Sequence, residues 1–281
     1  MAQALVDCVQ TAIAAIGTEI VSEEFRTSSH RLAQFAAATG AQSEVLLSGR
    51  VAVPTFAHVP VMQSMVEVLG RVTGALMLHG EHDFRFLNPI VPVQRLFSRS
   101  RLTGVRSNPA GLLLIVRSDT WQHHGDVVCT QYSTCILTGK AAPVAAGEAV
   151  PQRPQALAGA GDATSFDISP RLTEAYADAA RDYSAYCLDP EFALAAGFPA
   201  PIVYGMLSLS LAAIAVIDTH ASGDPTRLRR IGCRFAQPLY SRADERLVIE
   251  HAADPAGLIA FGASDGQGRT IMTRGYAEVM P

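Results

Sequence analysis

The sequence has few charged residues and almost no lysine. Charged side chains make up 17% of its 281 residues, the formal net charge is −4, and Lys140 is the only lysine. A protein that holds a nucleic acid backbone needs a surplus of basic side chains on one face. We therefore expect no nucleic acid partner.

Paired cysteines and long apolar runs are also absent. The five cysteines form no Cys-x-x-Cys pair and no cluster with histidine at zinc-ligand spacing, lying at positions 8, 129, 135, 187 and 233. This pattern favours a reducing compartment, the cytoplasm, and no metal site. The longest apolar run, residues 202–217, is shorter than the roughly 20 residues that cross a bilayer. Residues 1–16 lack the basic start of a signal peptide, so we expect neither targeting nor membrane association.

Apolar residues are abundant, at 49% of the chain, which indicates a globular protein with a large core. Residues 140–164 contain three prolines, no aromatic residue and no apolar periodicity. Such a composition is typical of a linker. We therefore predict an N-terminal domain over residues 1–139, a linker over 140–164, and a C-terminal domain over 165–281.

Each half shows the same order of predicted elements, a long apolar helix followed by several strands. The helices are predicted over residues 56–70 and 202–218. Alternation of apolar and polar residues predicts strands over 75–87, 93–106, 111–123 and 126–138, and again over 227–237, 244–252, 256–263 and 269–279. An antiparallel sheet with one apolar face needs a cover, which a helix laid across it supplies. The fold class is therefore α+β.

Two short matches indicate that the halves are copies of one unit. Residues 85–90 (RFLNPI) are similar to residues 234–239 (RFAQPL), each on the first strand after the helix. The Arg-Leu pair at 31–32 likewise matches the pair at 171–172, each opening a short helix near the start of its half. We infer duplication of one α+β unit.

The segment from Asp182 to Met206 reads DYSAYCLDPEFALAAGFPAPIVYGM. It resembles the hydratase 2 motif of the MaoC-like (R)-specific enoyl-thioester hydratases and dehydratases, approximately D-x-N-P-I-H-x-D-P-x-x-A-x-x-x-G-F-x-x-P-I-x-H-G-M. The resemblance implies a double hotdog, two antiparallel sheets each wrapped around a central helix. In such a chain the second half carries the active-site loop and the first half shapes the acyl pocket.

The resemblance also implies a lyase activity without a cofactor. The substrate would be a 2-enoyl or 3-hydroxyacyl thioester of coenzyme A or acyl carrier protein, hydrated or dehydrated in fatty-acid or polyketide-type metabolism. Asp182 matches the carboxylate that takes a proton from water, and Gly205 matches the amide that donates to the thioester carbonyl. Ser184, Tyr186 and Met206 fall at substrate-binding positions.

The sequence departs from this motif at the positions closest to the chemistry. The motif histidine falls on Cys187, its asparagine on Ser184, and the histidine before the helix glycine on Tyr204. A thiol cannot replace imidazole as a proton shuttle, since it is a weak donor whose pKa rises in an apolar pocket. The candidate catalytic residues are thus Asp182, Tyr204 and Cys187, with Cys187 better interpreted as a pocket-lining side chain.

Two other functions stay open. The same pocket could serve a tailoring enzyme of natural-product synthesis, either a cyclase that adds a substrate oxygen or nitrogen to an enoyl thioester or an isomerase. It could also belong to a non-catalytic subunit that binds acyl thioesters. A thioesterase is disfavoured, because enzymes of this fold usually place an acidic residue on the central helix and residues 206–217 contain none.

One further group of polar residues lies on the first strand of the first half. Strict alternation places His79, Glu81 and Asp83 on one face and His82 on the other, which argues against a metal cluster. We expect a polar strand at the interface between the halves. Two hotdogs can pair their sheet edges within one chain, so both a monomeric pseudo-dimer and a homodimer are consistent with the sequence.

Overall fold

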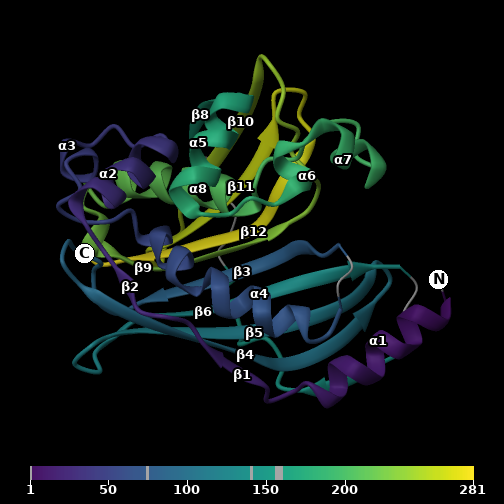
Figure 1. Ribbon diagram of the computed structural model, residues 1–281. Coiled ribbons are helices and arrows are strands. Elements are labelled where there is room, and N and C mark those ends of the chain that lie inside the picture. The colour runs from purple at the N-terminus through teal and green to yellow at the C-terminus, as the bar shows by residue number, and fades with distance from the viewer. Residues whose placement is uncertain (1, 74–75, 140–141, 156–160) are drawn as a thin grey trace.

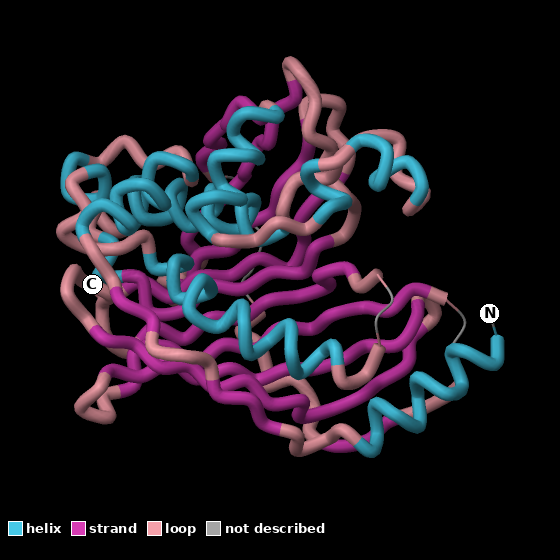
Figure 2. The backbone as a smooth tube through the Cα atoms, in the orientation of Figure 1, coloured by secondary structure: helices cyan, strands magenta, loops and turns pink. Residues whose placement is uncertain are grey.

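The computed structural model describes residues 2–73, 76–139, 142–155 and 161–281. Its strands form one antiparallel sheet of 12 strands, whose main path runs β1-β4-β5-β6-β3-β9-β12-β11-β10-β8. The helices lie mainly on the concave side of this curved sheet (Figures 1 and 2). The predicted α+β class is therefore confirmed, with the two expected sheets joined edge to edge.

The first half contributes the strands from β1 to β7. Two of them, β2 and β7, pair only with β4, outside the main path. The elements are α1 (Ala2–Ala14), β1 (Glu19–Val21), β2 (Phe25–Arg26), α2 (Ser29–Ala38), α3 (Glu44–Leu47), the 3-10 helix η1 (Pro54–Val61), α4 (Met62–Gly70), β3 (Leu78–Phe86), β4 (Arg95–Asn108), β5 (Gly111–Gln122), β6 (Val127–Thr138) and β7 (Ala145–Gly147).

The second half repeats this order without a counterpart of α1. Its elements are β8 (Asp162–Ile168), α5 (Pro170–Ala180), α6 (Ala185–Leu188), α7 (Pro190–Ala195), α8 (Gly205–His220), the 3-10 helix η2 (Pro225–Arg227), β9 (Leu228–Phe235), β10 (Glu245–Ala253), β11 (Leu258–Asp265) and β12 (Thr270–Val279). All eight strands predicted from the alternation are present, with ends within a few residues of those expected.

The halves meet at the strands that carry the repeated sequence. Strands β3 and β9 pair antiparallel at the centre of the sheet, with Asp83 opposite Gly232. Equivalent helices also meet, since α2 contacts α5 and the Phe35 and Tyr176 rings lie 5.7 Å apart. This pairing confirms that the polar strand β3 lies at the interface, and it relates the halves by an approximate twofold.

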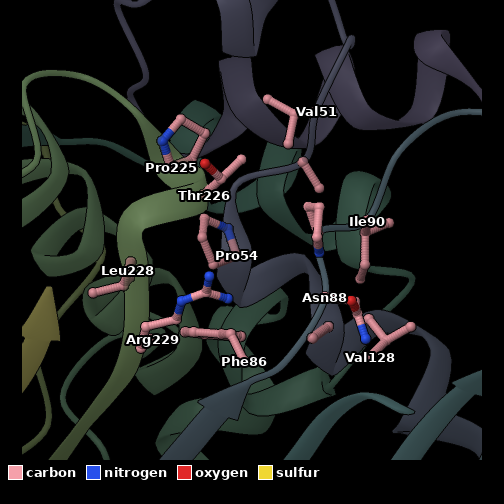
Figure 3. Close-up of a pocket in the computed structure, with 13 residues that line it drawn as sticks. Val51, Pro54, Phe86, Asn88, Ile90, Val128, Pro225, Thr226, Leu228 and Arg229 are labelled. Carbon is pink, nitrogen blue, oxygen red and sulfur yellow. The ribbon is translucent and has the colours of Figure 1, made fainter. Parts of the chain in front are cut away.

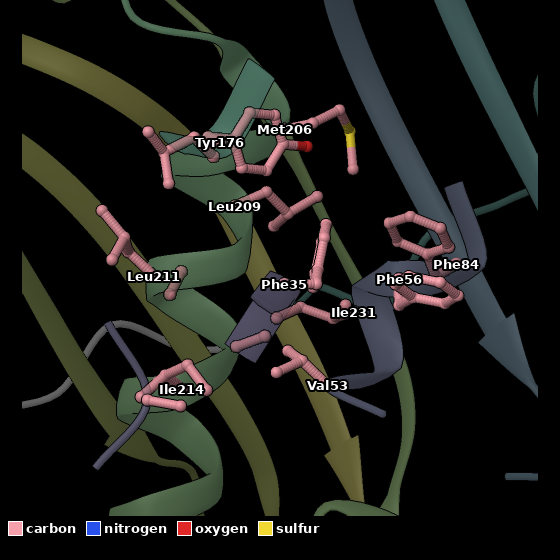
Figure 4. Close-up of a cluster of buried hydrophobic side chains, with 14 of the residues drawn as sticks. Phe35, Val53, Phe56, Phe84, Tyr176, Met206, Leu209, Leu211, Ile214 and Ile231 are labelled. Atoms are coloured by element: carbon pink, nitrogen blue, oxygen red, sulfur yellow. The ribbon is translucent and has the colours of Figure 1, made fainter. Parts of the chain in front are cut away.

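Helix α8 is the centre of the main core. All of its residues from Met206 to Ile217 are buried, so the helix is apolar on every side. Figure 4 shows α8 side chains packed beside Phe35, Phe56 and Phe84 of the first half. A second core lies under α1 and α4 against β4, β5 and β6. The main core therefore joins residues of both halves.

Two expected features differ in detail. The helix predicted over 56–70 is a 3-10 helix up to Val61 and α-helical only from Met62, because Pro60 lacks the N–H that an α-helix needs there. The expected linker at 140–164 contains β7, which pairs with β4, and the start of β8, which pairs with β10. Residues 140–141 and 156–160 of that segment lie outside the described residues.

A buried ion pair spans the junction and predicts a large effect on stability. Asp83 is fully buried, and its two carboxylate oxygens accept from Nε and Nη2 of Arg230 at 2.9 and 2.8 Å. Asp83→Asn would leave the guanidinium of Arg230 without its buried carboxylate partner. The substitution should therefore lower the free energy of unfolding by about 3 kcal/mol. Urea denaturation measures this loss.

The exposed pair of Asp167 and Arg246 supplies a control with the same change of charge. Asp167→Asn should alter the free energy of unfolding by less than about 1 kcal/mol, because exposed pairs contribute little. Equal losses in the two variants would contradict the role given to Asp83.

Candidate active site

The end of α5 sets the position of Asp182. Ser169 caps the helix by accepting from the Leu172 N–H, and Arg181 ends it in the left-handed conformation, at φ 56°. The Asp182 N–H then donates to the Ala177 carbonyl at 3.1 Å. This turn reverses the chain and brings Asp182 to the start of a loop that leads into α6.

The Asp182 carboxylate is held by the residue two positions further on. Its Oδ1 accepts from the Ser184 N–H at 3.1 Å and from the Ser184 hydroxyl at 2.6 Å. Among the described residues no side chain donates to Oδ2, so water or substrate can bind this oxygen. The loop therefore orients a partly buried carboxylate through one of its oxygens.

The residues that follow in the motif have a structural role. Asp189 caps α7 by accepting from the N–H groups of Glu191 and Phe192, and Pro190 occupies the first helical turn, where its missing N–H costs nothing. Gly197 adopts φ 89° after α7, a conformation that favours glycine. These residues return the chain from the Asp182 loop to the start of α8.

Gly205 is the first residue of α8. The segment before it is fixed by a hydrogen bond from the Val203 N–H to the Leu239 carbonyl at 2.8 Å. The first N–H groups of a helix have no intrahelical acceptor and lie at the positive end of its dipole. A Cβ on Gly205 would lie 3.2 Å from the Phe235 ring, so the glycine keeps this helix start close to the end of β9.

Tyr204 connects the two parts of the site. Its hydroxyl donates to the Asp182 carbonyl at 2.7 Å, and its ring packs 5.3 Å from that of Tyr176. Burial, together with nearby Cys187 and Asp182, raises the pKa of the Tyr204 hydroxyl far above its ordinary value. The hydroxyl is therefore protonated and holds the Asp182 loop against the residue that precedes Gly205.

The other predicted site residues surround this connection. Cys187 is buried, and burial followed by the charge of Asp182 raises the pKa of its thiol, so that it stays neutral. Burial also raises the pKa of Tyr186, which lies two residues after Ser184, the donor to the Asp182 carboxylate. Met206 is buried in the first turn of α8.

A cluster of three histidines, which the alternation of β3 does not predict, lies in the first half. Strict alternation separates His79 from His82, but the structure brings His79 Nε2 and His82 Nδ1 to 3.0 Å. The reason is a β-bulge at Gly80. Between His79 and Glu81, β3 contains one more residue than the paired segment of β6, so the side chains after the bulge change face. Glu81 and Asp83 therefore turn to the other face, where each pairs with an arginine.

His58 of η1 completes this group, and we call His58, His79 and His82 the histidine cluster. The His58 ring lies 5.4 Å from the His82 ring and 6.2 Å from the His79 ring. Among the described residues, no group of histidines, cysteines and carboxylates has an arrangement that holds a metal ion. An isolated glycine inside a strand often marks a bulge, so Gly80 was the available signal. Nothing in the sequence singled out His58.

A pocket lies between the two halves, next to Pro54, the residue that the repeat relates to Gly205 (Figure 3). The Ala52 N–H donates to the Ile90 carbonyl, just as the Val203 N–H donates to the Leu239 carbonyl. Pro54 follows Ala52 by two residues, as Gly205 follows Val203, so Pro54 occupies the equivalent position. The pocket is lined by Pro54, Phe86 and Leu228 among others. Because proline has no N–H, Pro54 offers no amide donor at the position that Gly205 occupies in the second half.

Comparisons with known proteins agree with this architecture. Residues 155–255 match the family described as MaoC like domain, and residues 48–139 match the MFE-2 hydratase 2 N-terminal domain. Together the two matches cover more than half of the chain. Each falls on one of the two repeated halves.

Curated relatives are similar over most of this chain. Enoyl-CoA hydratase 2, peroxisomal, of Arabidopsis thaliana is 27% identical over 80% of this chain and 77% of its own length. Peroxisomal multifunctional enzyme type 2 of Mus musculus is 27% identical over 66% of this chain, which spans only 26% of that longer protein.

Solved structures share the fold. A MaoC-like dehydratase from Phytophthora capsici has a TM-score of 0.80 at 21% identity, with 97% of this chain and 98% of that chain covered. The full-length peroxisomal multifunctional enzyme type 2 from Drosophila melanogaster has a TM-score of 0.76 at 20% identity, with 93% of this chain and 48% of that chain covered. With a MaoC-like domain in its second half and a hydratase 2 N-terminal domain in its first, the chain belongs to the MaoC-like hydratase and dehydratase family.

Proposed function

We propose that the protein is a lyase that hydrates a 2-enoyl thioester, or dehydrates the 3-hydroxyacyl thioester in the reverse direction. The hydrogen bond from Tyr204 to the Asp182 carbonyl carries the proposal. This hydrogen bond ties the loop that carries the Asp182 carboxylate to Tyr204, the residue before Gly205, whose N–H has no intrahelical acceptor. The two groups that this reaction needs, a proton acceptor and an oxyanion donor, are thereby held at one helix start.

The proposed reaction uses these groups in a defined way. The thioester oxygen accepts from the Gly205 N–H, where the amide and the helix dipole stabilise the negative charge that develops as C3 is attacked. The Asp182 carboxylate takes one proton from the attacking water while the water oxygen bonds to C3. A proton then adds to C2, which restores the thioester carbonyl and completes the addition of water without a metal or cofactor.

A direct assay tests this function. Purified protein is incubated with crotonyl-CoA and with longer 2-enoyl-CoA thioesters, and loss of the enoyl absorbance is followed. Hydration with release of a 3-hydroxyacyl-CoA supports the proposal. Absence of turnover with every chain length, while acyl-CoA still binds, would assign the protein to the non-catalytic binders instead.

Restoring the motif histidine gives a separate prediction. Cys187→His places an imidazole next to the Asp182 loop, so hydration should become about 10-fold faster, a modest part of what a positioned acid or base contributes. Steady-state kcat measures the gain, and Cys233→His, which alters a buried cysteine on β9, is the control. No gain in the folded Cys187→His variant would mean that the loop no longer orients water.

A second candidate function follows from the state of Cys187. Because burial keeps this thiol neutral, the loop itself supplies a carboxylate and no further proton carrier. Intramolecular addition of a substrate oxygen or nitrogen to an enoyl thioester requires only a base and the oxyanion donor. A cyclase is therefore the alternative, and it would convert an enoyl thioester that carries a terminal hydroxyl or amine into a ring.

We propose coenzyme A or acyl carrier protein as the carrier of the acyl group, and either a monomeric pseudo-dimer or a homodimer as the assembly. The domain division at residues 140–164 remains part of this proposal. All five cysteines are free, which supports the cytoplasm as a reducing location. Among the described residues, no helix is both long and apolar enough to cross a membrane.

A further inference from the structure

The pocket beside Pro54 is the counterpart of the space around Gly205. Pro54 and Gly205 begin equivalent helices, and Phe86 and Phe235 occupy the same place in the repeated sequences RFLNPI and RFAQPL. Phe86 lines the pocket, and the Phe235 ring lies against the position of a Cβ on Gly205. The two places share a helix start and an aromatic ring, so the differences between them indicate what each can bind.

The bulges of β3 and β9 extend this equivalence to a third position. Between Leu228 and Arg230, β9 contains one more residue than the paired segment of β12, as β3 does at Gly80 against β6. The extra residue of β9 is Arg229, so Arg229 and Gly80 are equivalent. Gly80 has no side chain, whereas the Arg229 side chain lines the pocket with its guanidinium toward Pro54 (Figure 3).

Arg229 gives the pocket a positive charge. In the part of the chain that the structure describes, no carboxylate pairs with its guanidinium, which donates from Nη1 to the Leu87 carbonyl at 3.3 Å. The nearby Arg85 and Arg230 differ, because both pair with the Asp83 carboxylate, at 3.9 and 2.8 Å. A guanidinium has five N–H donors and binds a carboxylate through two of them. Arg229 therefore keeps donors available for an anion.

The rest of the pocket is mostly apolar. Its volume is about 370 Å³, including the part that opens to solvent. The wall includes the buried side chains of Ile90, Val128 and Leu228, which come from both halves. Apolar walls with a few polar groups are typical of small-molecule sites. This cavity suits a short hydrocarbon chain with one anionic end.

We propose that this pocket binds a free short-chain carboxylic acid, with the carboxylate on the Arg229 guanidinium and the hydrocarbon chain against the apolar wall. Pro54 has no N–H to donate to a thioester carbonyl, whereas Arg229 can pair with a charged carboxylate. Relative to the space around Gly205, the pocket thus has a cation in place of a neutral amide donor. Binding here is independent of the hydration proposed for the second half, and it is measured without turnover.

Ligand-observed NMR titration with butyrate and hexanoate tests the site. Butyramide has the shape of butyrate without its charge, and inorganic phosphate is an anion without a hydrocarbon chain. Each probe is titrated into the wild-type protein, Arg229→Gln and Arg227→Gln. Arg227 lies two residues earlier, in η2, and is not among the residues that line the pocket, so its replacement removes the same charge from the same region. Thermal unfolding checks that each variant is folded.

Butyrate should bind saturably to the wild-type protein. Arg229→Gln should weaken this binding about 10-fold to 100-fold, the loss expected for a charge-assisted hydrogen bond. Arg227→Gln should change it less than about 3-fold, since an exposed charge outside the pocket contributes little. Butyramide and phosphate should each bind at least about 10-fold more weakly than butyrate, because each lacks one of the two features that the pocket recognises.

Three results would overturn the proposal. They are absence of saturable butyrate binding, unchanged butyrate affinity in a folded Arg229→Gln protein, and equal affinity for butyrate and either butyramide or phosphate. A carboxylate that binds at the Gly205 site instead would give the second of these results. If Arg229→Gln does not fold, the comparison of butyrate with butyramide in the wild-type protein decides the question without a variant.

Discussion

Replacing Asp182 with asparagine should lower kcat/KM for hydration of a 2-enoyl-CoA about 1,000-fold, within the range that a positioned acid or base contributes. The amide cannot take a proton from water. Its oxygen can still accept from the N–H and hydroxyl of Ser184, as Oδ1 of the carboxylate does, so the loop should keep its shape. The loss should therefore appear in kcat rather than in the affinity for acyl-CoA.

Asp178→Asn is the matched control for this experiment. Asp178 lies on the exposed side of α5, four residues before Asp182, and its replacement removes the same charge from the same region. It should leave kcat/KM within about 2-fold of wild type, since surface substitutions change little. Full activity in a folded Asp182→Asn protein would exclude this carboxylate as the base.

Replacing Gly205 with proline should remove the oxyanion donor and leave the helix start intact. Proline is favoured in the first turn of a helix, and Tyr204 has φ −55° and ψ 129°, a conformation compatible with a following proline. Pro54 already occupies the related position in the first half. Loss of one oxyanion donor costs about 100-fold to 1,000-fold in kcat.

Gly205→Ala separates the amide from the added bulk. Alanine and proline both place a Cβ about 3.2 Å from the Phe235 ring, but only alanine retains the N–H. We expect kcat of the proline variant to be about 100-fold below that of the alanine variant. Equal rates for the two variants would show that the Gly205 amide does not contact the reacting carbonyl.

The features that the sequence predicted best are those with a simple period or a dense motif. Period-two alternation located all eight long strands, and a continuous apolar run located α8. The motif from Asp182 to Gly205 identified the loop and helix start that the structure brings together through Tyr204. These features depend on local sequence, which a single chain displays directly.

The features that the sequence did not predict depend on contacts between distant segments. The bulge at Gly80 shifts the faces of β3, and without it His79 and His82 cannot meet. His58 joins these two histidines only when η1 packs beside β3. Gln131, whose Oε1 lies 3.2 Å from His58 Nδ1, comes from a further segment, strand β6. Neither the hydrophobic period of a segment nor the spacing of residues along the chain encodes such an arrangement.

The pairing of β3 with β9 has a consequence for how this chain could evolve. In an assembly of two identical subunits, every substitution appears at both related sites. A substitution that improves one site therefore also alters the other. Here the two copies share a sheet but differ in sequence, with proline at one helix start and glycine at the other. Each copy is thus free to change at its own helix start without altering the other.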